Sequence, residues 1–338
     1  LNGKEIVDAW CDRLRTQIEQ FVDFEGENSA LMVNNYDWTG DLSVLDFMRD
    51  VGKHFSVNSM IQKESVKQRI DREGSGISFT EFSYMLLQSW DFAELYRLHD
   101  CTLQVGGSDQ WGNITGGIDL TRRIHGAQVF GLTMPLIAKA DGTKFGKTES
   151  GTIWLDAGKT SPYSFYQFWL QAADADVYNF LRYFTFLSVE EIAEIERADQ
   201  EREGKPEAQS ILAAEVTKLV HGEEALSAAQ RITEALFSGD LGALTSGDCE
   251  QLELDGLPTS KLIDLESPLT NLFVEAGLAK NGSQAKDALK RNAVLVNGKA
   301  IGLDQNMDAQ QIFTEEHSLQ GNYFVVRLGK KSYHLFKL

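Results

Sequence analysis

A loop with two lysines is the first part of this sequence whose residues could carry out chemistry. Lys144 and Lys147 lie three residues apart in the stretch Lys-Phe-Gly-Lys-Thr, which ends at Thr148. Two ammonium groups on a glycine-containing loop can clamp a triphosphate and stabilise the charge that moves onto departing pyrophosphate. The stretch is not a P-loop, because Gly142 does not complete the GxxxxGK[ST] spacing. By its pattern alone, a solvated basic loop fits better than a nucleotide site.

A second candidate is the glycine pair Gly106 and Gly107, which is followed by Asp109 and Gln110. Glycines at the carboxyl end of a buried strand let the backbone approach a ligand closely, where open α/β sheets bind their ligands. The carboxylate of Asp109 can accept from ribose hydroxyls, and Gln110 can both donate and accept. An ordinary tight turn would show the same pair of glycines.

A third candidate is a polar stripe on an otherwise apolar helix. Tyr84, Gln88 and Asp91 are spaced i, i+4 and i+7, so a helix places all three on one face. Such a stripe must be solvated or must lie against a polar ligand. In the alternative interpretation, Tyr84 belongs to the core and the other two residues form its rim.

The elements that must position these residues alternate between helix and strand, as in an α/β domain. The apolar run 101–105 predicts a strand that leads into the glycine pair. A helix-like stretch follows and closes at Gly126, and the run 132–137 predicts the next strand.

Residues 155–240 read as a helical domain. Ser161 followed by proline, and Ser188 three residues before Glu191, predict two of its helix starts. Toward the C-terminus, the dipeptide Asn297-Gly298 between apolar runs is the strongest short hairpin signal, and a strand pair is expected over 323–336.

Composition and charge restrict the class of protein. The 338 residues are 42% hydrophobic and 24% charged, and no run approaches the ~20 apolar residues of a membrane-spanning helix. The net charge is −18, but residues 280–338 hold nine basic and five acidic residues, so this segment is +4 and the rest is −22. A basic tail on an acidic body indicates a polyanionic partner, although a chance fluctuation could give the same count.

The three cysteines show no CxxC spacing, and the six histidines form no HxxxH or HExxH pattern. Disulfides and a zinc site are therefore disfavoured, and a reducing cytosol is the expected compartment.

With these three motifs taken together, the chain resembles the bacterial tyrosyl-tRNA synthetases, which are class I aminoacyl-tRNA synthetases. The resemblance extends over almost the whole chain, and its motifs are residues 34–38, 51–57, 79–91, 106–113 and 144–148. The C-terminal segment resembles a small RNA-binding module first known from a ribosomal protein. Asn292 stands where that module often has glycine, and asparagine tolerates the positive φ of such a turn.

The resemblance implies an α/β fold built on a Rossmann-like parallel sheet, followed by an α-helical anticodon-binding domain and a small α+β RNA-binding domain. The implied boundaries are a partial catalytic domain over 1–150, a helical domain over 151–245, a linker over 246–266 and the RNA-binding domain over 267–338. The family's His-x-Gly-His signature does not occur in the chain. We expect the first βα unit, at least about 30 residues, to precede its first residue.

The resemblance also implies an activity. The enzyme would activate L-tyrosine with ATP, accompanied by Mg²⁺ but with no bound metal site, and transfer tyrosine to tRNA(Tyr). It would act in the cytoplasm, away from membranes, as a homodimer whose subunits meet near Phe55 and Phe79.

Each candidate residue receives a role by the same resemblance. Asp91 would accept from the phenolic hydroxyl of tyrosine, and Tyr84 and Gln88 would hold its α-ammonium group. The side chains lining the tyrosine and its carboxylate would be Gln104 and Gln110. The ribose would be held by Asp109 and the backbone of Gly106 and Gly107. The α-phosphate and departing pyrophosphate would be stabilised by Lys144, Lys147 and Thr148. The implied tRNA-binding residues are all basic and are Lys67, Arg122, Arg123, Lys286, Lys290, Arg291, Lys330 and Lys331.

Two alternatives stay open at this point. The first is an RNA-binding protein that kept the fold and lost adenylation; the missing signature favours it, and Asp91, Asp109 and the lysine loop oppose it. The second is a tryptophanyl-tRNA synthetase, whose architecture is similar. An aspartate aimed at a hydroxyl and the basic C-terminal module both argue against it.

Overall fold

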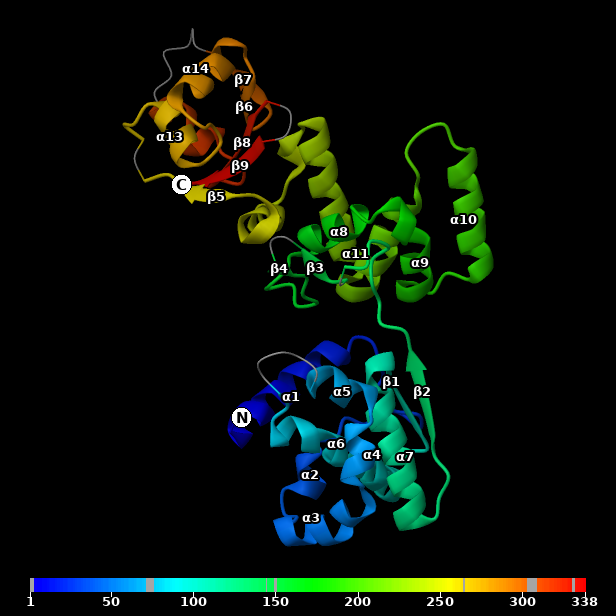
Figure 1. Cartoon of the computed structure of the whole chain (residues 1–338). Coiled ribbons are helices and arrows are strands. Elements are labelled where there is room, and N and C mark those ends of the chain that lie inside the picture. Colours follow the sequence, from blue (N-terminus) through cyan, green and yellow to red (C-terminus); the bar gives the residue numbers. More distant parts are fainter. Residues whose placement is uncertain are drawn as a thin grey trace. The chain divides into compact units, whose positions relative to one another are not determined.

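The computed structural model describes residues 3–70, 76–143, 145–148, 151–263, 265–302, 309–329 and 332–338, without the side chains of residues 64, 65, 68, 147, 148 and 151 (Figure 1). The chain forms two compact units, Leu1–Phe145 and Gly146–Leu338. No helix in the described ranges is long and apolar enough to cross a membrane.

The first unit is mostly helical and contains one pair of parallel strands. Its elements are α1 (Lys4–Ile18), α2 (Tyr36–Thr39), α3 (Val44–Asp50), η1 (Gly52–His54), α4 (Val57–Ile61), α5 (Glu64–Ile70), α6 (Phe79–His99), β1 (Leu103–Gly107), η2 (Ser108–Gln110), α7 (Trp111–His125) and β2 (Phe130–Met134).

Helix α6 carries the predicted polar stripe, and local signals define both of its ends. Ser78 and Glu81 form a capping box at the start, and Asp100 ends the helix with a left-handed φ of 51°. Helix α7 packs closely against α6 because its residue 117 is glycine. A Cβ at Gly117 would lie 2.9 Å from the buried Phe92.

Strands β1 and β2 pair in parallel, from Leu103 opposite Phe130 to Gly107 opposite Met134, and α7 connects them (Figure 1). The prediction of a strand, a helix closing at Gly126 and a second strand is confirmed, and Gly126 has the left-handed φ of 65°. Strand β1 begins and ends two residues later than predicted, so the glycine pair lies inside the paired strand, and β2 begins two residues and ends three residues earlier than predicted.

The second unit contains a short antiparallel strand pair, a helical part and a five-stranded sheet. Its elements are β3 (Lys147–Thr148), β4 (Gly151–Thr152), α8 (Pro162–Leu170), α9 (Asp174–Phe184), α10 (Val189–Glu201), α11 (Ala208–Ser238), η3 (Leu241–Ala243), α12 (Ser246–Gln251), the π-helical turn η4 (Leu252–Gly256), β5 (Thr259–Lys261), α13 (Leu269–Glu275), α14 (Gly282–Lys290), β6 (Val294–Val296), β7 (Lys299–Ile301), α15 (Ala309–Ile312), η5 (Glu315–His317), β8 (Tyr323–Leu328) and β9 (Ser332–Lys337).

The predicted helix starts of the helical part are confirmed. Ser161 caps α8, with proline at the first helical position, and Ser188 forms a capping box with Glu191 at α10. Helix α11 packs along α8 and is broken at Gly222, whose φ of 84° and ψ of 173° are not helical.

The sheet has the strand order β5-β9-β8-β6-β7, with β5 parallel to β9 and the other pairs antiparallel. Asn297 and Gly298 both have positive φ, 48° and 80°, as the predicted hairpin requires. Asn292 also has a positive φ, 52°, so the turn survives without glycine. The division into three domains with a linker stays a prediction, because the structure divides the chain into two compact units, with a single boundary between Phe145 and Gly146.

Candidate functional site

The carboxylate of Asp91 on α6 is held from both sides by one short segment. The indole Nε1 of Trp38, on α2, donates to Oδ1 at 2.9 Å. The amide Nδ2 of Asn35, the residue before α2, donates to Oδ2 at 3.2 Å. A carboxylate has about four acceptor positions, so each oxygen keeps one for a ligand hydroxyl. The site therefore holds a pre-oriented acceptor.

A chain of amide and carboxylate groups joins α6 to the loop after β1. Asn113 Nδ2 donates to Gln88 Oε1 at 2.9 Å and to Gln110 Oε1 at 3.2 Å. Gln110 Nε2 in turn donates to Asp109 Oδ2 at 3.0 Å. The structure thus brings three predicted site residues, Gln88, Gln110 and Asp109, into one network through Asn113. Gln88 Oε1 retains a lone pair that can accept from an ammonium group.

The glycine pair is needed by the loop itself. A Cβ at Gly107 would lie 2.6 Å from Asp109 Oδ1 and 2.9 Å from Leu136 Cδ2. A Cβ at Gly106 would lie 3.2 Å from Gln110 Cβ. Any side chain at Gly107 would displace the carboxylate predicted to hold the ribose, so the glycines position Asp109 in addition to admitting a ligand.

Two further predicted residues have no hydrogen bond to this network among the described residues. Tyr84 lies one turn before Gln88 on α6, and the residue is 58% exposed. Gln104 lies on β1, and its Oε1 is buried without a hydrogen-bond partner in the described part of the chain. A buried carbonyl oxygen of this kind is costly unless a ligand or water donates to it.

The lysine loop contributes little to the described geometry. Lys144 lies outside the described residues, as do the side chains of Lys147 and Thr148. The backbone of Lys147 and Thr148 forms β3, which pairs with β4. The roles assigned to these three residues stay predictions.

Three of the predicted tRNA-binding residues are in the first unit. Arg122 and Arg123 on α7 both pair with Asp119, at 2.6 and 2.7 Å. Burial alone would raise the pKa of Asp119, but these hydrogen bonds hold it below its ordinary value. Lys67 is exposed on α5. The two arginines are exposed and pre-oriented by a shared carboxylate, which partly neutralises them.

The other predicted RNA-binding residues belong to the part of the second unit that contains the five-stranded sheet. Lys286 and Lys290 are exposed on α14, four residues apart and on one face, and the exposed Arg291 comes directly after the helix. Lys330 and Lys331 lie outside the described residues.

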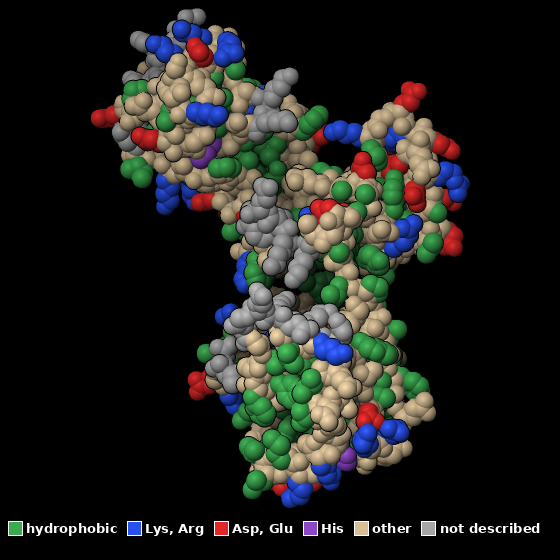
Figure 2. All heavy atoms as spheres, viewed as in Figure 1, with side chains coloured by type: hydrophobic (Ala, Val, Ile, Leu, Met, Phe, Trp, Pro, Cys, Tyr) green, Lys and Arg blue, Asp and Glu red, His purple; other side chains and the backbone are tan. Residues whose placement is uncertain are grey.

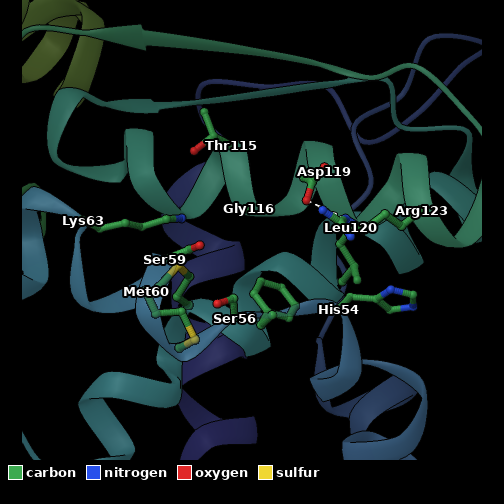
Figure 3. Close-up of a pocket in the computed structure, with 12 residues that line it drawn as sticks. His54, Ser56, Ser59, Met60, Lys63, Thr115, Gly116, Asp119, Leu120 and Arg123 are labelled. Atoms are coloured by element: carbon green, nitrogen blue, oxygen red, sulfur yellow. Dashed lines mark hydrogen bonds and ion pairs between the residues drawn. The ribbon is translucent and has the colours of Figure 1, made fainter.

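A pocket of about 270 Å³ lies beside Arg123 (Figure 3). Figure 3 shows Lys63 reaching toward α7, where its Nζ donates to the carbonyl of Gly112 at 2.5 Å. Burial lowers the pKa of Lys63. Because the ammonium is already bonded to the first turn of α7, we interpret Lys63 as a residue that positions this helix.

Comparison with known families divides the chain into two matched regions. The family described as tRNA synthetases class I (W and Y) matches residues 2–238. The family described as the tyrosine–tRNA ligase SYY-like C-terminal domain matches residues 248–336. Both regions therefore match families of tRNA synthetases.

The first family contains synthetases for tryptophan (W) and for tyrosine (Y), and individual relatives decide between these two amino acids. The tyrosine–tRNA ligase of Aliivibrio fischeri strain MJ11 is 60% identical over 337 residues, covering 99% of this chain and 78% of the relative. The corresponding enzyme of Chromobacterium violaceum is also 60% identical over 337 residues, with the same coverage. The chain belongs to the tyrosyl-tRNA synthetases. Its enzyme class is that of the aminoacyl-tRNA synthetases, and specifically a tyrosine–tRNA ligase.

Solved tyrosyl-tRNA synthetases share the fold. A C-terminally truncated mitochondrial tyrosyl-tRNA synthetase of Aspergillus nidulans has a TM-score of 0.56 and 30% identity, over 67% of this chain and 66% of that one. The enzyme of Coccidioides posadasii has a TM-score of 0.53 and 30% identity, over 65% and 64%. The predicted class I synthetase fold is confirmed, and the tryptophanyl alternative is not supported.

Three residues of the site had no role in the sequence-based prediction: Asn35, Trp38 and Asn113. All three lie inside motifs that carry the resemblance to tyrosyl-tRNA synthetases. A signal was present for Asn35 and Trp38, since two asparagines follow the run 30–33 and a tryptophan follows within three residues. Their partner on α6 is 53 to 56 residues away, so only the structure identifies it.

Proposed function

We propose that the protein converts L-tyrosine and ATP to tyrosyl-adenylate and pyrophosphate at the site around Asp91, and then transfers the tyrosyl group to a hydroxyl at the 3′ end of tRNA(Tyr), releasing AMP. In the first step a carboxylate oxygen of tyrosine attacks the α-phosphorus, the bond to the β-phosphate oxygen breaks, and pyrophosphate leaves. No covalent enzyme intermediate is needed, because positioning and charge stabilisation lower the barrier.

The observation that carries the proposal is the doubly held carboxylate of Asp91. Hydrogen bonds from Trp38 and Asn35 hold both of its oxygens without neutralising the charge, and each oxygen keeps an acceptor position that a ligand hydroxyl could use. A site that must bond a hydroxyl rejects an analogue that lacks it, because the buried acceptor is then left unpaired; tyrosyl-tRNA synthetase is itself the usual example of this rule. Asp91 would therefore select tyrosine over phenylalanine.

The remaining substrate groups are assigned by position. Tyr84 and Gln88 would hold the α-ammonium group; they lie two turns and one turn before Asp91 on α6, respectively. Gln104 Oε1 and Gln110 would line the tyrosine, and Asp109 would accept from the ribose hydroxyls of ATP. Mg²⁺ would arrive with ATP, and Lys144, Lys147 and Thr148 would stabilise the departing pyrophosphate.

The partner macromolecules are also part of the proposal. The basic residues on α7 and α14 would contact tRNA phosphates.

A homodimer would form through apolar surface that includes Phe79, which is 73% exposed at the start of α6. Figure 2 shows hydrophobic side chains gathered on the visible face of the first unit. Phe55, the other residue predicted near this contact, packs against the buried Met60 and Met85 and is partly buried. We place the enzyme in the cytoplasm.

The test is amino-acid-dependent exchange of pyrophosphate into ATP by the whole protein. We expect exchange with tyrosine, and far slower exchange with phenylalanine and tryptophan at equal concentration. Exchange that proceeds equally with phenylalanine, or that is absent with tyrosine while the protein still binds tRNA(Tyr), would contradict the proposal. The second outcome would instead indicate an RNA-binding protein.

A further inference from the structure

Strands β8 and β9 carry apolar side chains on both faces of the sheet. On one face, Phe324 opposite Phe336 belongs to a core with α13 and α14. On the other face, Val325 opposite Leu335 belongs to a separate core. A sheet that is solvated on one side alternates apolar and polar residues, whereas these strands are apolar on both sides. The second face, called here the docking face, therefore needs a cover.

The cover comes from the helical part of the same unit. The core on the docking face contains Leu236 of α11, Leu244, Cys249 of α12 and Leu252 of η4. Tyr163, in the first turn of α8, joins the same core. Side chains from the helices and from the sheet thus share one apolar core, with residues 246–256 between them.

Polar contacts cross the same boundary. The Tyr333 hydroxyl donates to the carbonyl of Leu236 at 2.8 Å, and Gln320 Nε2 donates to the carbonyl of Leu244 at 2.7 Å. A Cβ at Gly298 would lie 2.4 Å from the carbonyl oxygen of Gly239, so the β6–β7 turn lies directly on the end of α11. Contacts to backbone carbonyls at defined positions specify one orientation of the sheet.

Residues 246–256 are themselves fixed to the helices. Arg231 on α11 makes two hydrogen bonds of 2.7 Å to Asp248, which is 1% exposed. Asp255 accepts from the Ser161 backbone at 3.0 Å and from the Ser164 hydroxyl at 2.8 Å, at the start of α8. A bidentate ion pair with a buried carboxylate, together with hydrogen bonds to the start of α8, does not belong to a flexible tether.

We infer that residues 246–256 form a rigid wedge that docks the C-terminal module, residues 267–338, onto the helical part before any RNA binds. This contact buries the docking face, so that face of the sheet is not available to RNA. The basic residues Lys286 and Lys290 lie on α14, which covers the opposite face of the sheet, so the docked module leaves them exposed. Helices and module would then contact RNA as one preassembled surface. The docking does not rest on the proposed function.

The three native cysteines test this inference without any introduced cysteine or fluorophore. Cys249 is fully buried in the shared core, and burial raises its pKa to about 12, whereas Cys11 and Cys101 are only partly buried. A thiol that is buried and protonated reacts slowly. Iodoacetamide labelling of the whole RNA-free protein, read by peptide mass spectrometry, follows the three cysteines separately.

We expect Cys249 to be alkylated at least tenfold more slowly than in the same chain unfolded in urea. Tyr333→Phe removes the hydrogen bond to Leu236 and should accelerate Cys249 labelling about two- to tenfold. The matched control is Tyr178→Phe, which removes a bond to Asp199 inside the helical part and should leave the rate unchanged.

Three results would overturn the inference. Labelling of Cys249 within tenfold of the unfolded rate would show that the module is detached. Protection that responds to neither tyrosine variant would show that the helices alone bury Cys249. An equal response to both variants would show that labelling follows opening of the whole unit and not release of the module. Because neither readout uses aminoacylation, failure here leaves the proposed function untouched.

Discussion

The indole nitrogen of Trp38 donates to Asp91 at 2.9 Å, across 53 residues of sequence. With Asn35 on the other oxygen, it holds the carboxylate in a defined orientation. The proposed selection of tyrosine depends on this arrangement, because a freely rotating carboxylate would lose part of its advantage in binding one hydroxyl.

Trp38→Phe should weaken the use of tyrosine while keeping the ring in place. A hydrogen bond to a charged group contributes about 1.5–3 kcal/mol, and because Asn35 still holds the other oxygen we expect about a tenfold loss in kcat/KM for tyrosine. Trp10→Phe on α1 is the matched control and should have no effect. An unchanged kcat/KM for tyrosine in Trp38→Phe would mean that the indole does not position Asp91.

Lys147→Ala should slow tyrosyl-adenylate formation by about 10- to 100-fold with little change in tyrosine affinity. The ammonium group acts on charge that develops in the transition state, so ground-state binding is spared. Single-turnover kinetics and equilibrium binding separate the two quantities. Weaker tyrosine binding at an unchanged rate would instead assign the loop a structural role.

Arg231→Met should destabilise the second unit by about 3 kcal/mol at pH 7, because it removes the charged partner of the buried Asp248 carboxylate and leaves it the backbone N–H of Thr245. Burial alone would raise the pKa of Asp248, and the hydrogen bonds from Arg231 and Thr245 hold it below its ordinary value. In the wild type this stability is present above about pH 4 and is lost as the pH falls through the lowered pKa.

In the Arg231→Met variant, the effect of Asp248 on the pH dependence of stability has the opposite sign. Burial acts without the guanidinium, the pKa of Asp248 rises, and the folded state takes up a proton that the unfolded state releases above about pH 4. The difference from wild type should therefore widen between pH 4.5 and 7.5 in urea titrations. Arg182→Met, which removes an exposed 3.7 Å pair with Glu196, is the control and should cost less than about 1 kcal/mol at both pH values. If the difference in unfolding free energy between wild type and Arg231→Met does not change with pH, Arg231 does not keep Asp248 ionised.

The double variant Lys286→Ala/Lys290→Ala should reduce tRNA charging and leave adenylate formation intact. For each phosphate that the protein no longer neutralises, the dependence of log K on log salt should flatten by about 0.7 on single strands. Lys218→Ala on α11, where the lysine is exposed and paired with Glu223, is the control. Deleting the whole module would be a poorer test, because it would expose Leu236 and Leu252 of the shared core. An unchanged salt slope would remove α14 from the RNA-binding surface.

Local signals in the sequence predicted the features that depend on neighbouring residues. The capping box of Ser188 with Glu191 and the Asn297-Gly298 hairpin are confirmed because each is determined within a few residues. Strand β5 was not predicted, because its three residues pair with β9 some 76 positions later and leave no periodic pattern.

The candidate site shows the same limit. The helical spacing of Gln88 and Asp91 predicted a shared face, but not that Asn113 and Trp38 would hold them. The two-sided burial of β8 did leave a signal, since the apolar run 323–326 does not alternate. A continuous apolar strand indicates burial on both faces, and this feature supports the docking of the module.

The proposed selection of tyrosine by Asp91 is tested most directly by the amino-acid preference of Asp91→Asn in pyrophosphate exchange by the whole protein. Asparagine keeps an oxygen for Trp38 but turns an amide toward Asn35, and it loses the charge that accepts from the tyrosine hydroxyl. We expect the ratio of kcat/KM for tyrosine to that for phenylalanine to fall by at least tenfold, because about 1.5–3 kcal/mol of hydroxyl-specific stabilisation is lost. Equal losses for both amino acids, with an unchanged ratio, would contradict the proposed selection.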